Sequence, residues 1–133
     1  MTLEDFLSVI KTVAKNAQFC KPEKAYAKCS EFSEGVFLLG KELGFPVELW
    51  EGKINFQGND VDHIFLKIDN RFYDYTYKQI DPKSTFPLVG EKSLHPNAKK
   101  LNIKYPSDAR IDYNSEIWYK KLKHLLKNKK HQT

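Results

Sequence analysis

The chain has 133 residues, of which 41% are hydrophobic and 29% are charged, and it contains two cysteines. This length suits one domain with a modest core and leaves no room for two. The formal net charge of +5 is carried by residues 114–133, which contain six lysines and one glutamate. Residues 1–113 are therefore neutral, with sixteen basic and sixteen acidic side chains. A neutral body argues against a nucleic-acid binder that spreads basic side chains over a folded face.

The apolar runs and the N-terminal residues bear on the cellular location. Val36–Leu39 is far shorter than the roughly 20 residues needed to cross a bilayer, so we expect no membrane span. Glu4 and Asp5 stand where a secretory signal peptide needs basic residues. We expect a cytoplasmic protein, or an effector delivered by a route that uses no signal peptide. In a reducing cytoplasm Cys20 and Cys29 are free thiols, whereas delivery outside the cell would permit a disulfide between them.

Two helices are predicted in the N-terminal part. Apolar residues recur at helical spacing from Leu3 to Ala17, directly after Thr2, which suits a helix start. A second apolar stripe predicts a helix from Cys29 to Leu43. Gly44 and Pro46 follow as the expected stop signal.

The hydrophobic period then changes to that of β-strands. Alternation predicts strands at Val47–Glu51, Ile64–Ile68 and Arg71–Tyr77. Asp69 and Asn70 both tolerate left-handed backbone angles, so they predict a two-residue turn between the last two strands. The middle of the chain is therefore expected to form an antiparallel sheet.

The C-terminal part is expected to be loop followed by a closing helix. Residues 81–112 contain four prolines and no sustained period, which predicts mostly loop with one short strand at Leu101–Lys104. Asn114 is a candidate cap for an amphipathic helix whose buried side is Ile117, Trp118, Leu122, Leu125 and Leu126. The sequence thus predicts the α+β class, with one domain over 1–113 and a closing helix with a lysine-rich tail over 114–133.

Cys29, His63 and Asp74 occur in an order that suits thiol chemistry. A helix N-terminus and a nearby imidazolium both stabilise a thiolate, and Cys29 is predicted to begin a helix. The predicted turn places Phe65 opposite Asp74, so His63 lies diagonal to Asp74 on the same sheet face, with roughly 7–8 Å between their backbones. Asp74 can then orient the imidazole. The backbone N–H of Cys29 is expected to be available to a developing oxyanion.

Four segments resemble the transglutaminase-like branch of the papain-like fold: Lys28-Cys29-Ser30, Leu43-Gly44-Phe45-Pro46-Val47, Asp62-His63-Ile64-Phe65-Leu66 and Phe72-Tyr73-Asp74-Tyr75-Thr76. The resemblance covers roughly residues 25–80. In that superfamily a Cys-His-Asp/Asn triad serves thiol peptidases, transglutaminases, deamidases and papain-fold toxins. The resemblance implies helices packed on an antiparallel sheet, with Cys29 as nucleophile, His63 as general base and acid, and Asp74 as the orienting residue. The papain-type signature C-G-[SA]-C-[WY] is absent around Cys29, and a structural or solvated role is favoured for Gln18, the candidate side-chain oxyanion donor.

The function predicted from this pattern is thiol-dependent acyl transfer on amide bonds, by a cysteine peptidase, a protein deamidase or a transglutaminase-like enzyme. The expected partner is a protein or peptide with a glutamine side chain or a scissile peptide bond. No cofactor and no metal are expected, since Cys20, Cys29, His63 and His95 lack the paired spacings of a structural zinc site. Two alternatives stay open: a non-catalytic binding or inhibitory protein that retains the fold, and electrostatic nucleic-acid binding through the tail. For the tail, a solvated helix face is favoured.

Overall fold

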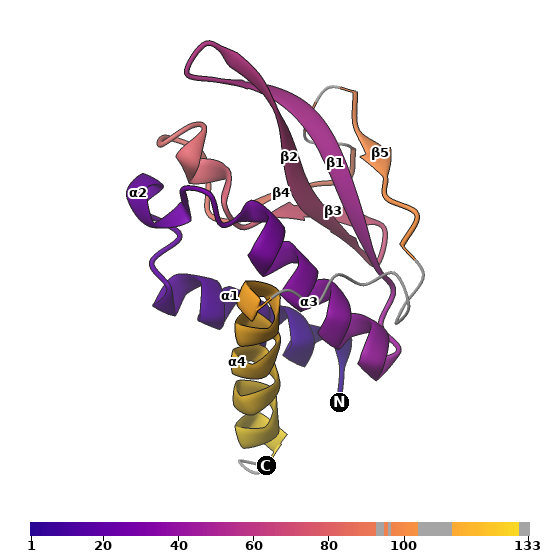
Figure 1. Cartoon of the computed structure of the whole chain (residues 1–133). Helices are drawn as coiled ribbons and strands as arrows, with labels where there is room; N and C mark the ends of the chain where they lie inside the picture. Colours follow the sequence, from indigo (N-terminus) through magenta and orange to yellow (C-terminus); the bar gives the residue numbers. More distant parts are fainter. Residues whose placement is uncertain (93–94, 96, 104–112, 131–133) are drawn as a thin grey trace.

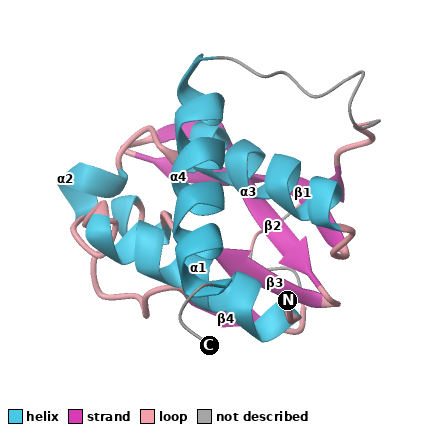
Figure 2. Ribbon diagram, turned by 90° about the horizontal axis from the view of Figure 1, so that it is seen from below, coloured by secondary structure: helices cyan, strands magenta, loops and turns pink. Residues whose placement is uncertain are grey.

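A five-stranded antiparallel sheet has a group of helices packed on one of its faces (Figure 1). This computed structural model describes residues 1–92, 95, 97–103 and 113–130. In the view from below, the helices lie in front of the strands (Figure 2). The α+β class predicted from the sequence is confirmed, and the finer papain-like assignment stays a prediction.

The two N-terminal helices begin and end close to where the sequence predicts. Helix α1 (Leu3–Asn16) starts with a capping box in which the Thr2 hydroxyl accepts from the N–H of Asp5 and the Asp5 carboxylate accepts from the N–H of Thr2. Helix α3 (Cys29–Leu43) has the predicted bounds. Gly44 ends α3 with a φ of 80°, a left-handed conformation that glycine adopts without strain.

The sheet has the strand order β4-β3-β2-β1-β5. Its strands are β1 (Val47–Phe56), β2 (Asn59–Ile68), β3 (Arg71–Asp74), β4 (Leu88–Gly90) and β5 (Lys99–Lys100). Strands β1 and β2 both extend beyond their predicted bounds. The prediction is too short because the residues near the tip of the hairpin are mostly exposed and show no buried-exposed alternation. Gln57 and Gly58 form its turn with φ values of 53° and 84°.

The turn between β2 and β3 has the predicted register. Asp69 and Asn70 have φ values of 49° and 66°, and Ile68 pairs with Arg71. Strand β3 nevertheless ends at Asp74 rather than at Tyr77.

Its end has a local cause. The Asp74 carboxylate accepts a hydrogen bond from the backbone N–H of Thr76, and this side-chain turn leads the chain out of the sheet. The 3₁₀ helix η1 (Tyr77–Gln79) follows and contacts α2 (Pro22–Ala25), a one-turn helix between the two predicted helices.

The C-terminal elements differ from the prediction mainly at their ends. The short strand predicted at Leu101–Lys104 is β5, which begins two residues earlier, at Lys99. The N–H of Leu101 still donates to the carbonyl of Leu49. Lys104 lies outside the described residues. Helix α4 (Tyr113–Lys130) begins one residue before Asn114. All five residues predicted for its inner side are buried or half-buried.

None of the helices in the described parts of the chain is both long enough and apolar enough to cross a membrane.

The main core lies between the sheet and the helices. Helix α3 packs against β1 and β2, while α4 packs against α3 and α1. The strands contribute Val47, Leu49, Leu66 and Ile68 to this core. Because strand side chains alternate, the neighbouring residues of β2, such as Phe65, point to the opposite face of the sheet.

Helices α3 and α4 approach closely and are joined by partly buried polar contacts. The Glu31 carboxylate accepts from Trp118 Nε1 at 2.6 Å, and the Glu34 carboxylate accepts from Ser115 Oγ at 2.7 Å. Gly35 faces the same part of α4, close to Ser115 and Trp118. A Cβ atom added to Gly35 would come within 2.8 Å of the Cβ of Trp118.

This close approach predicts that Gly35→Ala destabilises the protein. Because the obstructing atoms include backbone and a Cβ atom, the helices must separate, and we expect unfolding free energy to fall by roughly 1–3 kcal/mol in urea denaturation. Lys11→Ala, at an exposed position of α1, should change it by less than about 0.5 kcal/mol. Equal stability of Gly35→Ala and the natural protein would contradict the close packing of α3 and α4.

Candidate active site

A small second cluster lies on the sheet face turned away from the helices. The ring of Phe65 on β2 contacts the rings of Phe72 on β3 and of His95, at centroid distances of 5.9 and 4.7 Å. His63, two residues before Phe65, contacts His95 at 5.1 Å. These aromatic rings exclude water from the end of β3, where Asp74 lies.

Asp74 and His63 make a short hydrogen bond in this cluster. His63 Nε2 lies 2.6 Å from Asp74 Oδ2, and each side chain is at most 2% exposed. His95 Nε2 lies 2.9 Å from the same oxygen. The other oxygen, Oδ1, accepts from the backbone N–H of Thr76 at 3.0 Å and from its hydroxyl at 3.3 Å. The buried carboxylate is therefore hydrogen-bonded at both oxygens.

These bonds determine where the imidazole protons lie. An ionised carboxylate only accepts hydrogen bonds, so both His63 and His95 donate from Nε2–H. The second nitrogen of His63, Nδ1, then carries a lone pair when the ring is neutral and a proton when it is charged. Asp74 thus fixes the tautomer that a general base needs.

The opposite charges of His63 and Asp74 raise the pKa of the histidine and lower the pKa of the aspartate, so both side chains are ionised. Burial disfavours charge on His63, but the hydrogen bond and the negative charge of Asp74 outweigh it and raise the pKa of His63 to about 10. Burial likewise disfavours the Asp74 carboxylate, yet the charge of His63 and hydrogen bonds from both histidines lower the pKa of Asp74 well below its usual value. The pair is an imidazolium and a carboxylate at neutral pH.

Cys29 lies beside His63 at the first residue of α3. Its side chain is half-buried, and Lys28 before it provides no side-chain cap for the helix. Burial raises the pKa of the Cys29 thiol, but hydrogen bonding to His63, the positive charge of His63 and the backbone N–H of Ile64 together lower it. The surroundings of Cys29 therefore favour a thiolate.

The three residues predicted from the sequence are not all in mutual contact. His63 and Asp74 are in direct contact, whereas Asp74 affects the Cys29 thiol only through its charge, which raises the thiol pKa. Cys29 is not among the side chains whose donor atoms cluster within 4.8 Å, which are His63, Asp74 and His95. A closed Cys29–His63–Asp74 triad therefore stays a prediction.

Sequence reasoning missed two partners of Asp74. Thr76 follows Asp74 by two residues, so an Asp-x-Thr turn was a signal in the sequence. His95 is 21 residues away in a stretch without periodic pattern, and no spacing rule connects it to Asp74. From the sequence, His95 is a candidate only for a zinc site, which its spacing does not support.

Two glutamines differ in their suitability as oxyanion donors. Gln18 is exposed beyond the end of α1, with a φ of 63°, as expected for a solvated role. Gln79 of η1 accepts the backbone N–H of Ala27 at 3.1 Å through its side-chain oxygen. Its Nε2 is buried and has no hydrogen-bond partner among the described residues. Because Ala27 precedes Cys29 by two residues, the Gln79 amide is anchored near the start of α3.

Three side chains could hold a metal ion by position, namely His63, Asp74 and His95. Metal ligands about 2.0–2.2 Å from one ion lie roughly 3 Å or more from each other. The observed separations of 2.6 and 2.9 Å are those of charge-assisted hydrogen bonds. We therefore assign the cluster as a proton-bridged network.

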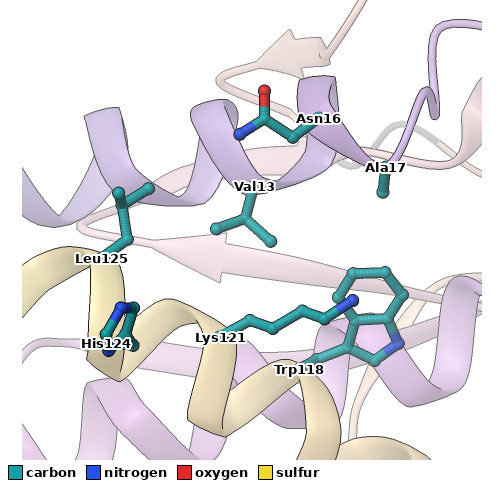
Figure 3. Close-up of a pocket in the computed structure, with 7 residues that line it drawn as sticks. All are labelled: Val13, Asn16, Ala17, Trp118, Lys121, His124 and Leu125. Atoms are coloured by element: carbon teal, nitrogen blue, oxygen red, sulfur yellow. The ribbon is translucent and has the colours of Figure 1, made fainter.

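A separate cavity of about 290 Å³ lies between α1 and α4 (Figure 3). Val13 and Asn16 line it from α1, and Trp118 and Lys121 line it from α4. It contains none of the three candidate catalytic residues.

Comparisons with family models, with curated proteins and with solved structures found no match to this chain.

The raised pKa of His63 predicts a pH-dependent contribution to stability. Because the folded pKa of about 10 exceeds the unfolded value of 6.5, this contribution is complete below pH 6.5 and is lost as the pH rises through about 10. At pH 6 we expect His63→Gln to lower the unfolding free energy by roughly 1.5–3 kcal/mol, the usual range for a hydrogen bond to a charged group. This difference should shrink steadily between pH 6.5 and 10 in urea denaturation.

His124→Gln is the matched control, since His124 is exposed on α4. Its difference from the natural protein should be small at every pH. A His63→Gln difference that stays constant from pH 6 to 10 would show that the imidazole is not charged in the folded protein.

Proposed function

We propose that this protein is a thiol-dependent acyl-transfer enzyme that acts on amide bonds, with Cys29 as nucleophile, His63 as general base and acid, and Asp74 as the orienting residue. The observation that carries the proposal is the buried 2.6 Å His63–Asp74 bond next to a thiol whose pKa is lowered by that same histidine. Structural cysteines in apolar surroundings have a raised pKa. The papain-like assignment of the fold belongs to the same proposal.

The reaction begins at the thiolate. Cys29 Sγ attacks the carbonyl carbon of the amide, and the carbonyl electrons move to oxygen to give a tetrahedral oxyanion. In this proposal the sulfur pairs with Nδ1 of His63, the ring nitrogen that Asp74 leaves available. The oxyanion collapses, the C–N bond breaks, and the leaving amine takes the proton from Nδ1–H. A thioester on Cys29 and a neutral His63 remain.

The second half regenerates the enzyme. Neutral His63 accepts a proton at Nδ1 from water or from an attacking amine, whose oxygen or nitrogen adds to the thioester carbon. The C–S bond then breaks and the thiolate returns beside the imidazolium. Water gives peptide hydrolysis or deamidation, and an amine gives transglutamination. The substrate we propose is an exposed amide of a protein or peptide.

Two N–H donors are available for the oxyanion. The backbone N–H of Cys29, at the first turn of α3, has no intrahelical acceptor. The second donor in this proposal is Gln79, because its buried Nε2 lacks a partner and its oxygen is bonded to Ala27. A donor aimed at a developing oxyanion stabilises the transition state more than the substrate.

The nucleophile assignment predicts unequal reactivity of the two thiols. Cys20 is exposed and Cys29 is half-buried, so accessibility alone would make Cys20 react faster. We expect iodoacetamide at pH 7 to modify Cys29 at least about 10-fold faster, because the thiolate is the reacting form. His63→Ala should remove the difference, with site-resolved mass spectrometry as the measurement. Faster modification of Cys20 in the natural protein would contradict the proposal.

If Gln79 is an oxyanion donor, its loss should lower turnover without changing the reactivity of the Cys29 thiol. Gln79→Leu keeps the shape of the side chain but removes the donor, so we expect ammonia release from a glutamine-containing peptide to fall roughly 10²-fold. Alkylation of Cys29 should be unchanged, since it forms no oxyanion. Gln18→Leu is the matched control and should leave turnover unchanged. Full turnover in Gln79→Leu would remove Gln79 from the site.

A further inference from the structure

His95 reaches the site from the segment between β4 and β5 and has no part in the mechanism above. Its side chain is 1% exposed, and its Nε2 donates to Asp74 Oδ2 at 2.9 Å. That oxygen also accepts from His63 at 2.6 Å. Two histidines thus share one carboxylate oxygen in a buried environment.

The Asp74 carboxylate has its acceptor positions filled. A carboxylate oxygen has two lone-pair sites, so two donors on Oδ2 and two from Thr76 on Oδ1 use all four. Rotation of the carboxylate would break several of these bonds in a place that water does not reach. Removing the His95 donor would free one lone pair on the oxygen that binds His63.

Ring contacts fix the orientation of His95. Its ring lies 4.7 Å from Phe65 and 5.2 Å from Tyr77, measured between centroids. It meets the His63 ring nearly at a right angle, with 84° between the two planes. The two Nε2–H groups therefore approach Asp74 from different directions.

Sharing the oxygen has an electrostatic consequence. Each donor neutralises part of the negative charge on Oδ2, so His95 weakens the attraction between Asp74 and the imidazolium of His63. A general acid works best when its proton is not bound too tightly at the working pH. Three titratable side chains act on or contact His63 in the described structure: Asp74 from β3, Cys29 from α3, and His95.

We propose that His95 is a positioning residue that fixes the Asp74 carboxylate and weakens its attraction for His63, so that His63 can release its Nδ1 proton to the leaving amine. The part about the leaving amine rests on the proposed function. The part about Asp74 and His63 rests on the hydrogen bonds alone.

The test is an NMR titration of the His63 ring in protein labelled with ¹⁵N at histidine. Cys29→Ala serves as the parent, so that the result does not depend on thiol reactivity. His95→Gln keeps an N–H donor, whereas His95→Phe keeps an aromatic ring without one. We expect His95→Phe to raise the pKa of His63 by roughly 0.5–1 unit, because Asp74 loses one hydrogen bond that partly neutralises its charge. His95→Gln should shift it by less than about 0.3 unit on the same scale.

Turnover provides the second measurement, in protein that retains Cys29. His95→Phe should lower ammonia release from a glutamine-containing peptide roughly 10-fold while leaving the iodoacetamide rate of Cys29 nearly unchanged, because alkylation needs no proton transfer to a leaving group. His95→Gln should restore most of the turnover. Unreactive Cys29 together with the expected NMR shifts would refute the proposed function and leave the His95 assignment in place.

Three results would overturn the assignment of His95. The first is an unchanged His63 titration in His95→Phe, and the second is a His95→Gln shift as large as that of His95→Phe. The third is stoichiometric Zn²⁺ binding to the Cys29→Ala protein by calorimetry that His95→Phe abolishes, since it would identify a metal centre. If His95→Phe does not fold, rapid solvent exchange of the His95 Nε2–H in the parent protein would overturn the assignment instead.

Discussion

The buried carboxylate of Asp74 is the constraint on which the site depends. An isolated carboxylate in an apolar environment would be protonated or would destabilise the fold, so it needs donors at both oxygens. Thr76 supplies two of them and, by doing so, ends β3 and turns the chain into η1. His63 and His95 supply the others from two separate segments. One requirement therefore fixes the end of a strand and the orientation of two imidazoles.

The two faces of the sheet have different roles. The face that packs on α3 contributes large apolar side chains to the main core, while the opposite face contains the aromatic and imidazole cluster. Helix α3 connects the two parts, because its middle is buried in the core and its first residue, Cys29, adjoins His63. The hydrogen bonds of Glu31 and Glu34 to α4 fix α3 in this position. Stability of the helical layer and geometry of the thiol are thus coupled.

The parts of the fold that the sequence predicts correctly are those with a strong local signal. Thr2 and Gly44 are capping residues, and the stripes between them repeat at helical spacing, so two helices are found almost to the residue. Asp69-Asn70 fixes the register that brings Asp74 to the face of His63. The predicted end of this strand at Tyr77 is wrong, because the local hydrogen bond from Thr76 to Asp74 turns the chain out of the sheet although the alternation continues. His95 escapes prediction because its bond to Asp74 spans 21 residues of chain and its neighbours show no pattern.

The central claim is that the Cys29 thiol is ionised by its interaction with His63. Its most direct measurement is an ultraviolet titration of thiolate absorbance in Cys20→Ser protein, with and without His63→Gln. The account predicts a Cys29 thiolate that persists well below the ordinary cysteine pKa of about 8.5, and its loss near neutral pH in His63→Gln. An ordinary titration of Cys29 near pH 8.5 that His63→Gln does not change would contradict it.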